Sequence, residues 1–254
     1  MPPAAPPPAA ETLVCRGLAK SYAVGPAACA ERRAVLHDLS LVVDRGTLVA
    51  TLAPTAGGGL GARTLLRCLA GLATPDAGTI VWRGPRGERV PPPRRALVGE
   101  DWRPSAACLT VRDVVEGAVP VGSWQAEADR RVALALESTG LAAHAGRLAA
   151  PLAPAVRWRV GVAAALAAGA EWLLLEPPAA AAADAASRDA EATAAALLAA
   201  HRGGVTILAG VTPAVALRLP RARVLHWRGG ALARAPVAAA ARRVAEWGAA
   251  GSRR

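Results

Sequence analysis

The chain of 254 residues lacks phenylalanine, and it has a single tyrosine, Tyr22, and a single lysine, Lys20, among its 30 basic residues. Alanine supplies much of the hydrophobic content of 53%, and a GC-rich coding sequence is the simplest explanation of this composition. The net charge of +11 comes from arginines scattered in pairs, without a basic run interleaved with aromatics. We therefore expect solvated arginine faces and no specific nucleic-acid partner.

Closely spaced metal-binding or disulfide-forming residues are also missing. The four cysteines lie far apart without a Cys-x-x-Cys pair, and the four histidines are isolated, which argues against a zinc site and a disulfide framework. Residues 1–11, rich in Pro and Ala, lack the basic and apolar parts of a signal peptide, so we expect a disordered lead-in. The longest apolar run, residues 160–170, is too short to span a bilayer, and a cytoplasmic protein is expected.

The most informative stretch is residues 48–72, which predicts a short apolar strand, a glycine-rich turn and a helix that opens near Ala62. Loops that bind phosphate are built in this way. Glycines let backbone N–H groups approach the phosphates, and the helix N-terminus adds the positive end of its dipole. The full pattern, Gly-x-x-x-x-Gly-Lys-[Ser/Thr], is damaged here.

Two registers can be placed on the damaged pattern. If the pattern starts at Gly57, then Ala62 stands at its second glycine. Arg63 then replaces the lysine, and Thr64 keeps the magnesium-binding hydroxyl. If the following helix sets the register, Gly61 is retained, Ala62 replaces the lysine and Arg63 replaces the hydroxyl. The lysine is missing in both cases, and an arginine near a helix N-terminus, unfavourable against the dipole, favours a nearby anion.

Strands and helices alternate along the rest of the chain, which implies an α/β sheet covered on both faces. A polar-rich helical pattern over residues 110–148 predicts an inserted helical sub-domain, and residues 25–33 predict a loop. Strands are expected at residues 12–22, 36–43, 48–52, 79–83, 97–98, 172–175, 205–211 and 223–227, and helices at residues 62–72, 155–169, 184–201 and 213–219.

The order and spacing of four stretches resemble those of an ATP-binding cassette (ABC) transporter ATPase domain, over about residues 13–234. The resemblance implies a P-loop NTPase-like core, in which helices flank a mixed sheet, and an N-terminal antiparallel β part. The expected domain covers residues 12–235, with its helical sub-domain at about 105–160, followed by a C-terminal helix or basic tail at 236–254. The four stretches are residues 64–80, 109–115, 159–178 and 204–230.

This resemblance also implies an ATP site between two subunits, with Mg²⁺ beside the phosphates. Tyr22 stands where the family stacks an aromatic ring on adenine, Asp101 at a glutamine position, and Glu176 at the magnesium-linked aspartate. Thr64, Asp101 and Glu176 are the expected metal ligands if Mg²⁺ binds. The expected nucleotide-binding positions are Tyr22, Gly57, Gly58, Gly59, Gly61, Ala62, Arg63, Thr64, Asp101 and Glu176.

The groups that would carry out hydrolysis are lost from the matching positions. The signature Leu-Ser-Gly-Gly-Gln becomes residues 152–156, with Pro154 in place of a glycine. Pro177 stands at the position of the base and Pro213 at that of the phosphate-sensing histidine. No catalytic residue is expected, because phosphoryl transfer depends on such positioned groups. ATP hydrolysis should be negligible, and the same losses weaken the expectation that ATP and Mg²⁺ bind.

Four interpretations remain open. The one we rank first is a catalytically inactive subunit, acting as structural or regulatory partner of an ABC membrane permease or of a second ABC subunit, in a homo- or heterodimer. Such a protein would lie at the inner face of the cell membrane through its partner. The second is an atypical ATPase that uses Arg63, Thr64, Asp101 and Glu176. The third is a basic scaffold for nucleic acid, and the fourth is a decayed or artificial paralogue without function.

Overall fold

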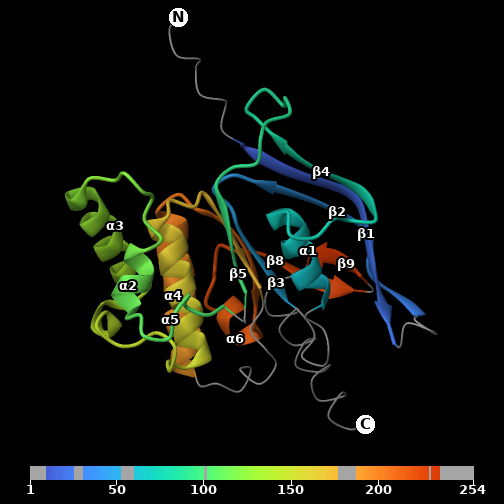
Figure 1. Cartoon of the computed structure of the whole chain (residues 1–254). Coiled ribbons are helices and arrows are strands. Elements are labelled where there is room, and N and C mark those ends of the chain that lie inside the picture. Colours follow the sequence, from blue (N-terminus) through green and yellow to red (C-terminus); the bar gives the residue numbers. More distant parts are fainter. Residues whose placement is uncertain are drawn as a thin grey trace, which may run out of the picture.

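The computed structural model describes residues 10–25, 31–52, 60–99, 102–176, 187–228 and 230–234. Its first sheet is antiparallel, with strands in the order β2-β1-β4 (Figure 1). Register shifts interrupt the pairing of β1 with both neighbours, so the long strand bends along its length. The three strands are β1 (Thr12–Val24), β2 (Glu31–Asp44) and β4 (Ala77–Arg83).

The second sheet has six strands in the order β5-β6-β7-β3-β8-β9. The first five pair in parallel, and β9 closes the edge as an antiparallel hairpin with β8. Strands β3, β6 and β7 are buried along their whole length, as parallel strands are when both faces of a sheet are covered. The strands are β3 (Leu48–Leu52), β5 (Arg95–Val98), β6 (Trp172–Leu175), β7 (Thr206–Val211), β8 (Arg223–Arg228) and β9 (Ala231–Arg234).

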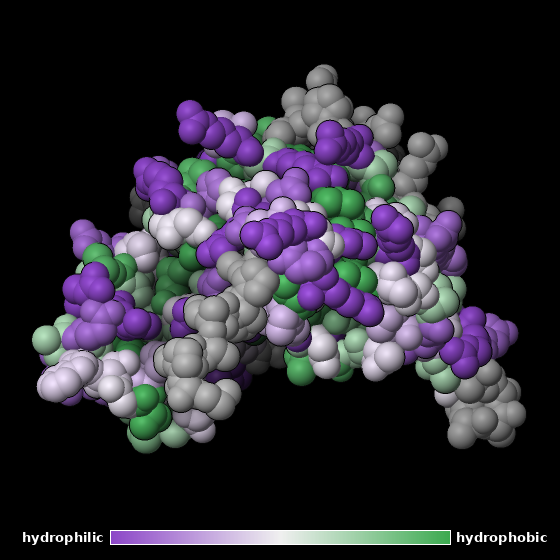
Figure 2. All heavy atoms as spheres, turned by 90° about the horizontal axis from the view of Figure 1, so that it is seen from above, coloured by the Kyte–Doolittle hydropathy of each residue, from purple (hydrophilic) through white to green (hydrophobic). Residues whose placement is uncertain are grey.

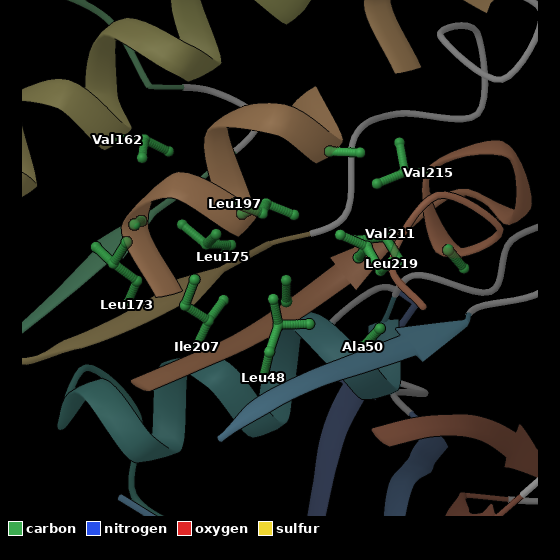
Figure 3. Packing of buried hydrophobic residues seen from close by; sticks show 14 of the residues in the cluster. Leu48, Ala50, Val162, Leu173, Leu175, Leu197, Ile207, Val211, Val215 and Leu219 are labelled. Carbon is green, nitrogen blue, oxygen red and sulfur yellow. The ribbon is translucent and has the colours of Figure 1, made fainter. Parts of the chain in front are cut away.

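Helices cover both faces of the six-stranded sheet. Helix α1 lies between the two sheets, where its apolar side packs with residues from both (Figure 1). On the opposite face, α4, α5 and α6 cover side chains such as Leu48, Leu173 and Ile207 (Figure 3). The helices are α1 (Leu60–Ala70), α2 (Val111–Glu116), α3 (Gln125–Ser138), η2 (Ala142–His144), α4 (Pro154–Ala167), α5 (Ser187–Arg202) and α6 (Pro213–Ala216).

Helix α4 joins the sheet to a separate group of helices. One side of α4 packs on the sheet, and the other shares a third apolar core with α2 and α3. The helix approaches β5 so closely at Gly161 that an added Cβ would lie 2.8 Å from Val98 Cγ1 and 3.1 Å from Trp102 Cδ2. The absence of a side chain at Gly161 therefore lets α4, on which α2 and α3 pack, lie close against the sheet.

The mixed sheet flanked by helices and the N-terminal antiparallel part are both present as predicted. Several boundaries differ by a few residues, among them the starts of β2 and α1. Strand β2 begins at Glu31, inside the predicted loop, because its first residues pair with the end of β1, as Arg33 does with Tyr22. Helix α1 begins at Leu60 rather than near Ala62. Most of the predicted lead-in and the whole predicted C-terminal tail lie outside the described residues.

The surface carries hydrophilic side chains over much of the face shown in Figure 2, interleaved with hydrophobic ones. In the part of the chain that the structure describes, no helix combines the length and the apolar character needed to cross a membrane.

Candidate functional site

A buried ion pair joins α1 to the end of β6. Glu176 follows β6 directly, and its backbone N–H donates to the carbonyl of Val98 at 3.0 Å. Its side chain is only 2% exposed. Arg67 Nε donates to Glu176 Oε1 at 2.9 Å, and Arg63 Nε lies 3.6 Å from Oε2. Each oxygen of this carboxylate therefore faces a guanidinium group.

The two arginines reach one carboxylate because they stand four residues apart on α1, which places them on the same face of the helix. A buried carboxylate is strongly unfavourable unless it is paired, so Glu176 and its partners depend on each other. The anion expected near Arg63 is thus a side chain of the protein itself. Arg67 was not among the predicted site residues. Its spacing from Arg63 is the signal that could have found it.

Two positions of the damaged phosphate-loop pattern serve packing. Ala62, at the lysine position in one register, is 1% exposed and belongs to the apolar core between the two sheets. At Gly61 an added Cβ would lie 2.9 Å from the Trp227 ring, so this glycine allows α1 to approach β8. A lysine in place of Ala62 would have to bring its ammonium group out of an apolar core.

Thr64, the expected metal-binding hydroxyl, points toward the predicted adenine-stacking residue. Its side chain is buried, and Oγ1 lies 3.5 Å from the hydroxyl of Tyr22. Tyr22 is 40% exposed, and Lys20 Nζ lies 5.6 Å from the centre of its ring, a geometry suited to a cation–π contact. The ring of Tyr22 is therefore placed beside the first turns of α1.

A charged cluster fixes the chain next to Tyr22. Asp76 accepts hydrogen bonds of 2.8 Å from Lys20 Nζ, from the backbone N–H of Ser21 and from Ser21 Oγ, and Arg32 adds a contact of 3.3 Å. The Lys20 ammonium, followed by the two donors of Ser21, holds the pKa of the Asp76 carboxyl well below its usual range. The same bond to Asp76 raises the pKa of Lys20.

We expect Asp76→Asn to lower the thermal stability at neutral pH and to lose this effect in acid. Because the folded-state pKa of Asp76 is depressed, its stabilisation is fully present above the unfolded pKa, about 3.9 for aspartate. It is lost as the pH falls through the folded-state value. Unfolding temperatures of both proteins between neutral pH and strong acid should therefore converge at the acid end.

The matched control is Asp129→Asn, which removes the same charge from an exposed position on α3. A constant difference between the wild type and Asp76→Asn at all pH values would show that the ionised carboxylate is not responsible.

The start of α4 falls in residues 152–156, the stretch that the resemblance aligns with the signature loop. The helix begins at Pro154, one residue earlier than predicted, and Ala153 at its N-cap makes no side-chain hydrogen bond. Arg157 turns back to donate to the carbonyls of Ala150 at 3.2 Å and Leu152 at 2.8 Å. This helix start offers no hydroxyl at Ala153 and no N–H at Pro154 to a phosphate.

Pro213, which the resemblance aligns with the family's histidine, is the first residue of α6. The hydroxyl of Thr212 accepts from the N–H of Val215 at 3.4 Å and caps the helix. Proline is favoured at the first helical position because its missing N–H would be unpaired there anyway. Pro213 therefore has a structural explanation that is independent of any ligand.

Several predicted site residues lie outside the described ranges, and the remaining ones do not form a Mg²⁺ site. Mg²⁺ requires oxygen ligands at near-ideal octahedral geometry. Glu176 has both oxygens turned to arginines, and Thr64 lies against Tyr22. Within the described ranges, no three Asp, Glu, His or Cys side chains gather as metal ligands. The predicted residues outside these ranges are Gly57, Gly58, Gly59, Asp101 and Pro177.

Comparison with known proteins relates the chain to bacterial import systems. It is 40% identical over 144 residues to the sulfate/thiosulfate import ATP-binding protein CysA of Mycolicibacterium paratuberculosis. It is also 35% identical over 151 residues to the taurine import ATP-binding protein TauB of Pseudomonas aeruginosa. Its homologues are ATP-binding subunits of ABC transporters. No protein-family model matches the chain.

These matches to ABC subunits are partial. They cover 56% of this chain and 39% of CysA, and 58% of this chain and 54% of TauB. The chain therefore spans about half or less of the length of these relatives, and their activities do not transfer with the match.

Solved ABC structures show the same fold over nearly the whole chain. A nucleotide-free ATP-binding cassette from an ABC transporter has a TM-score of 0.66 at 17% identity and covers 93% of this chain and 98% of its own. The cbiO1 protein of Clostridium perfringens, part of the ABC transporter complex cbiONQ, has a TM-score of 0.64 at 19% identity and covers 89% and 88%. The predicted ABC ATPase fold is thus confirmed.

Proposed function

We propose that this chain is an ABC-type subunit that does not hydrolyse ATP and serves as a structural or regulatory partner of a membrane permease or of a second cassette. The observation that carries the proposal is the state of Glu176, whose two oxygens face Arg67 and Arg63 in a buried setting. In phosphoryl transfer, the protein contributes mainly position and charge. A carboxylate held in this way does not position a metal ion.

Two further positions support the proposal. Pro177 stands where the family has its water-activating base, and a proline side chain cannot accept a proton. The helix start has no hydroxyl at Ala153 and no backbone N–H at Pro154, so two donors that could contact a phosphate are missing. Removal of a catalytic base alone slows a reaction by roughly 10²–10⁴-fold, and here it is combined with other losses. The chain would then contribute its fold and surfaces to the transporter.

Purified protein should release no phosphate from ATP above background, with or without Mg²⁺. A sensitive phosphate-release assay tests this, together with a titration of ATP in the same buffers. Clear Mg²⁺-dependent turnover that Glu176→Ala abolishes would overturn the proposal. Binding of ATP without release is compatible with it and would make the chain a nucleotide-sensing partner, with Tyr22 as the residue that contacts adenine.

A further inference from the structure

We propose that the guanidinium groups of Arg67 and Arg63 take the place of a divalent cation at Glu176 and fasten α1 to β6 without metal or nucleotide. The inference rests on the proposed function, because it concerns the same site. It adds that the site excludes Mg²⁺ and that the arrangement of these side chains does not depend on bound metal or nucleotide.

The two guanidinium groups compete with a metal ion for the oxygens of Glu176. Arg67 Nε is within hydrogen-bond distance of Oε1, and Arg63 Nε lies 3.6 Å from Oε2. A metal ion at about 2.0–2.1 Å from either oxygen would bring a second positive charge close to a guanidinium, beside a carboxylate that is 2% exposed. Metal binding at Glu176 therefore requires that an arginine be displaced first.

Burial separates this pair from the other strong arginine–glutamate contacts of the chain. On α3, Glu127 accepts from Arg131 at 2.8 Å and pairs with Arg130 at 2.7 Å, but its side chain is 34% exposed. Water can replace either partner there. At Glu176 the side chain is 2% exposed, so a lost arginine is not readily replaced by water. The two sites offer the same chemistry at two levels of burial.

The pair also joins segments that are far apart in the chain. Arg67 and Glu176 are separated by 109 positions, and the side chains of α1 and β6 meet in the apolar core between the sheets. The helix that follows the glycine-rich loop is thus tied to the strand that precedes the family's catalytic positions. In this arrangement an internal cation makes the connection that a bound metal would otherwise support.

The test is a titration with Mn²⁺, a paramagnetic substitute for Mg²⁺, followed by electron paramagnetic resonance of the free ion, with and without ATP. The wild type and Glu176→Gln should give superimposable binding curves. If the wild type binds Mn²⁺ and Glu176→Gln binds at least tenfold more weakly, the inference is wrong.

A second comparison tests the role of the arginines. The double variant Arg63→Gln with Arg67→Gln should acquire a Mn²⁺ site that disappears when Glu176→Gln is added. Arg130→Gln with Arg131→Gln is the control, and it should bind Mn²⁺ as the wild type does. A folded Arg63/Arg67 variant without added Mn²⁺ binding would overturn the replacement. If circular dichroism shows it to be unfolded, the comparison of wild type with Glu176→Gln decides.

The two proposals can fail separately. Phosphate release without Glu176-dependent Mn²⁺ binding would refute the proposed function and leave the replacement intact. Glu176-dependent Mn²⁺ binding without phosphate release would refute the replacement and leave the proposed function intact.

Discussion

Gly78→Ala should destabilise the protein by about 2–5 kcal/mol, because the new methyl group meets backbone that cannot move aside. An added Cβ at Gly78 would lie 2.4 Å from the carbonyl oxygen of Gly17 and 2.6 Å from that of Arg16. The residue also has a φ of +90°, which side chains rarely adopt. Denaturant unfolding, analysed for both midpoint and slope, measures the loss.

Gly87→Ala is the matched control. Gly87 has a φ of +77°, but an added Cβ would meet nothing within 4 Å. Its loss should be limited to the backbone strain, about 1–2 kcal/mol, partly offset by a stiffer unfolded chain. Equal losses for both variants would show that the contact with Gly17 is relieved by a small shift of the strands.

This close contact matters for the candidate site because it shapes the sheet that carries Tyr22. Gly78 lies opposite the irregular part of β1, where the register with β4 shifts between Arg16 and Ala19. Asp76 precedes β4 and fixes Lys20 and Ser21 just beyond this irregularity. A disturbed β1–β4 pairing should therefore also move Tyr22.

The sequence predicted the central strands well, because their signals are local. Residues 48–52 and 172–175 are short apolar runs, and both are strands with these bounds. The hairpin between β8 and β9 turns at Gly230, which has a φ of +82°. Short apolar runs and turn glycines indicate the local conformation from neighbouring residues alone.

The missed features depend on contacts between distant segments. Helix α1 takes in Leu60 and Gly61, which the sequence placed in the turn, because Gly61 packs on Trp227. Arg67 looked like any solvated arginine on a helix, although its partner Glu176 lies far along the chain. A glutamate after an apolar strand indicates a functional or capping carboxylate, and only the fold reveals which cation it meets. The part of the site outside the described residues stays a prediction.

The pairing of Glu176 leads to the second large expected effect. Arg67→Met should destabilise the protein by about 2–3 kcal/mol, near the lower end of the range for breaking a buried pair. It removes the 2.9 Å bond and leaves the carboxylate to Arg63, while the 48% exposure of the Arg67 side chain limits the loss. Arg131→Met, which removes a 2.8 Å bond to the partly exposed Glu127, should change the stability little.

A double-mutant cycle separates the ion pair from the packing of the Arg67 side chain. Adding Glu176→Met to Arg67→Met removes the poorly paired buried charge. The double variant should therefore lose less stability than the sum of the losses in the two single variants. Urea unfolding of the wild type, the two single variants and the double variant at neutral pH gives the coupling free energy between Arg67 and Glu176. Simple additivity would mean that Arg67 stabilises the protein through contacts other than the one with Glu176. A large coupling would identify the buried charge as the reason why α1 needs an arginine at this position.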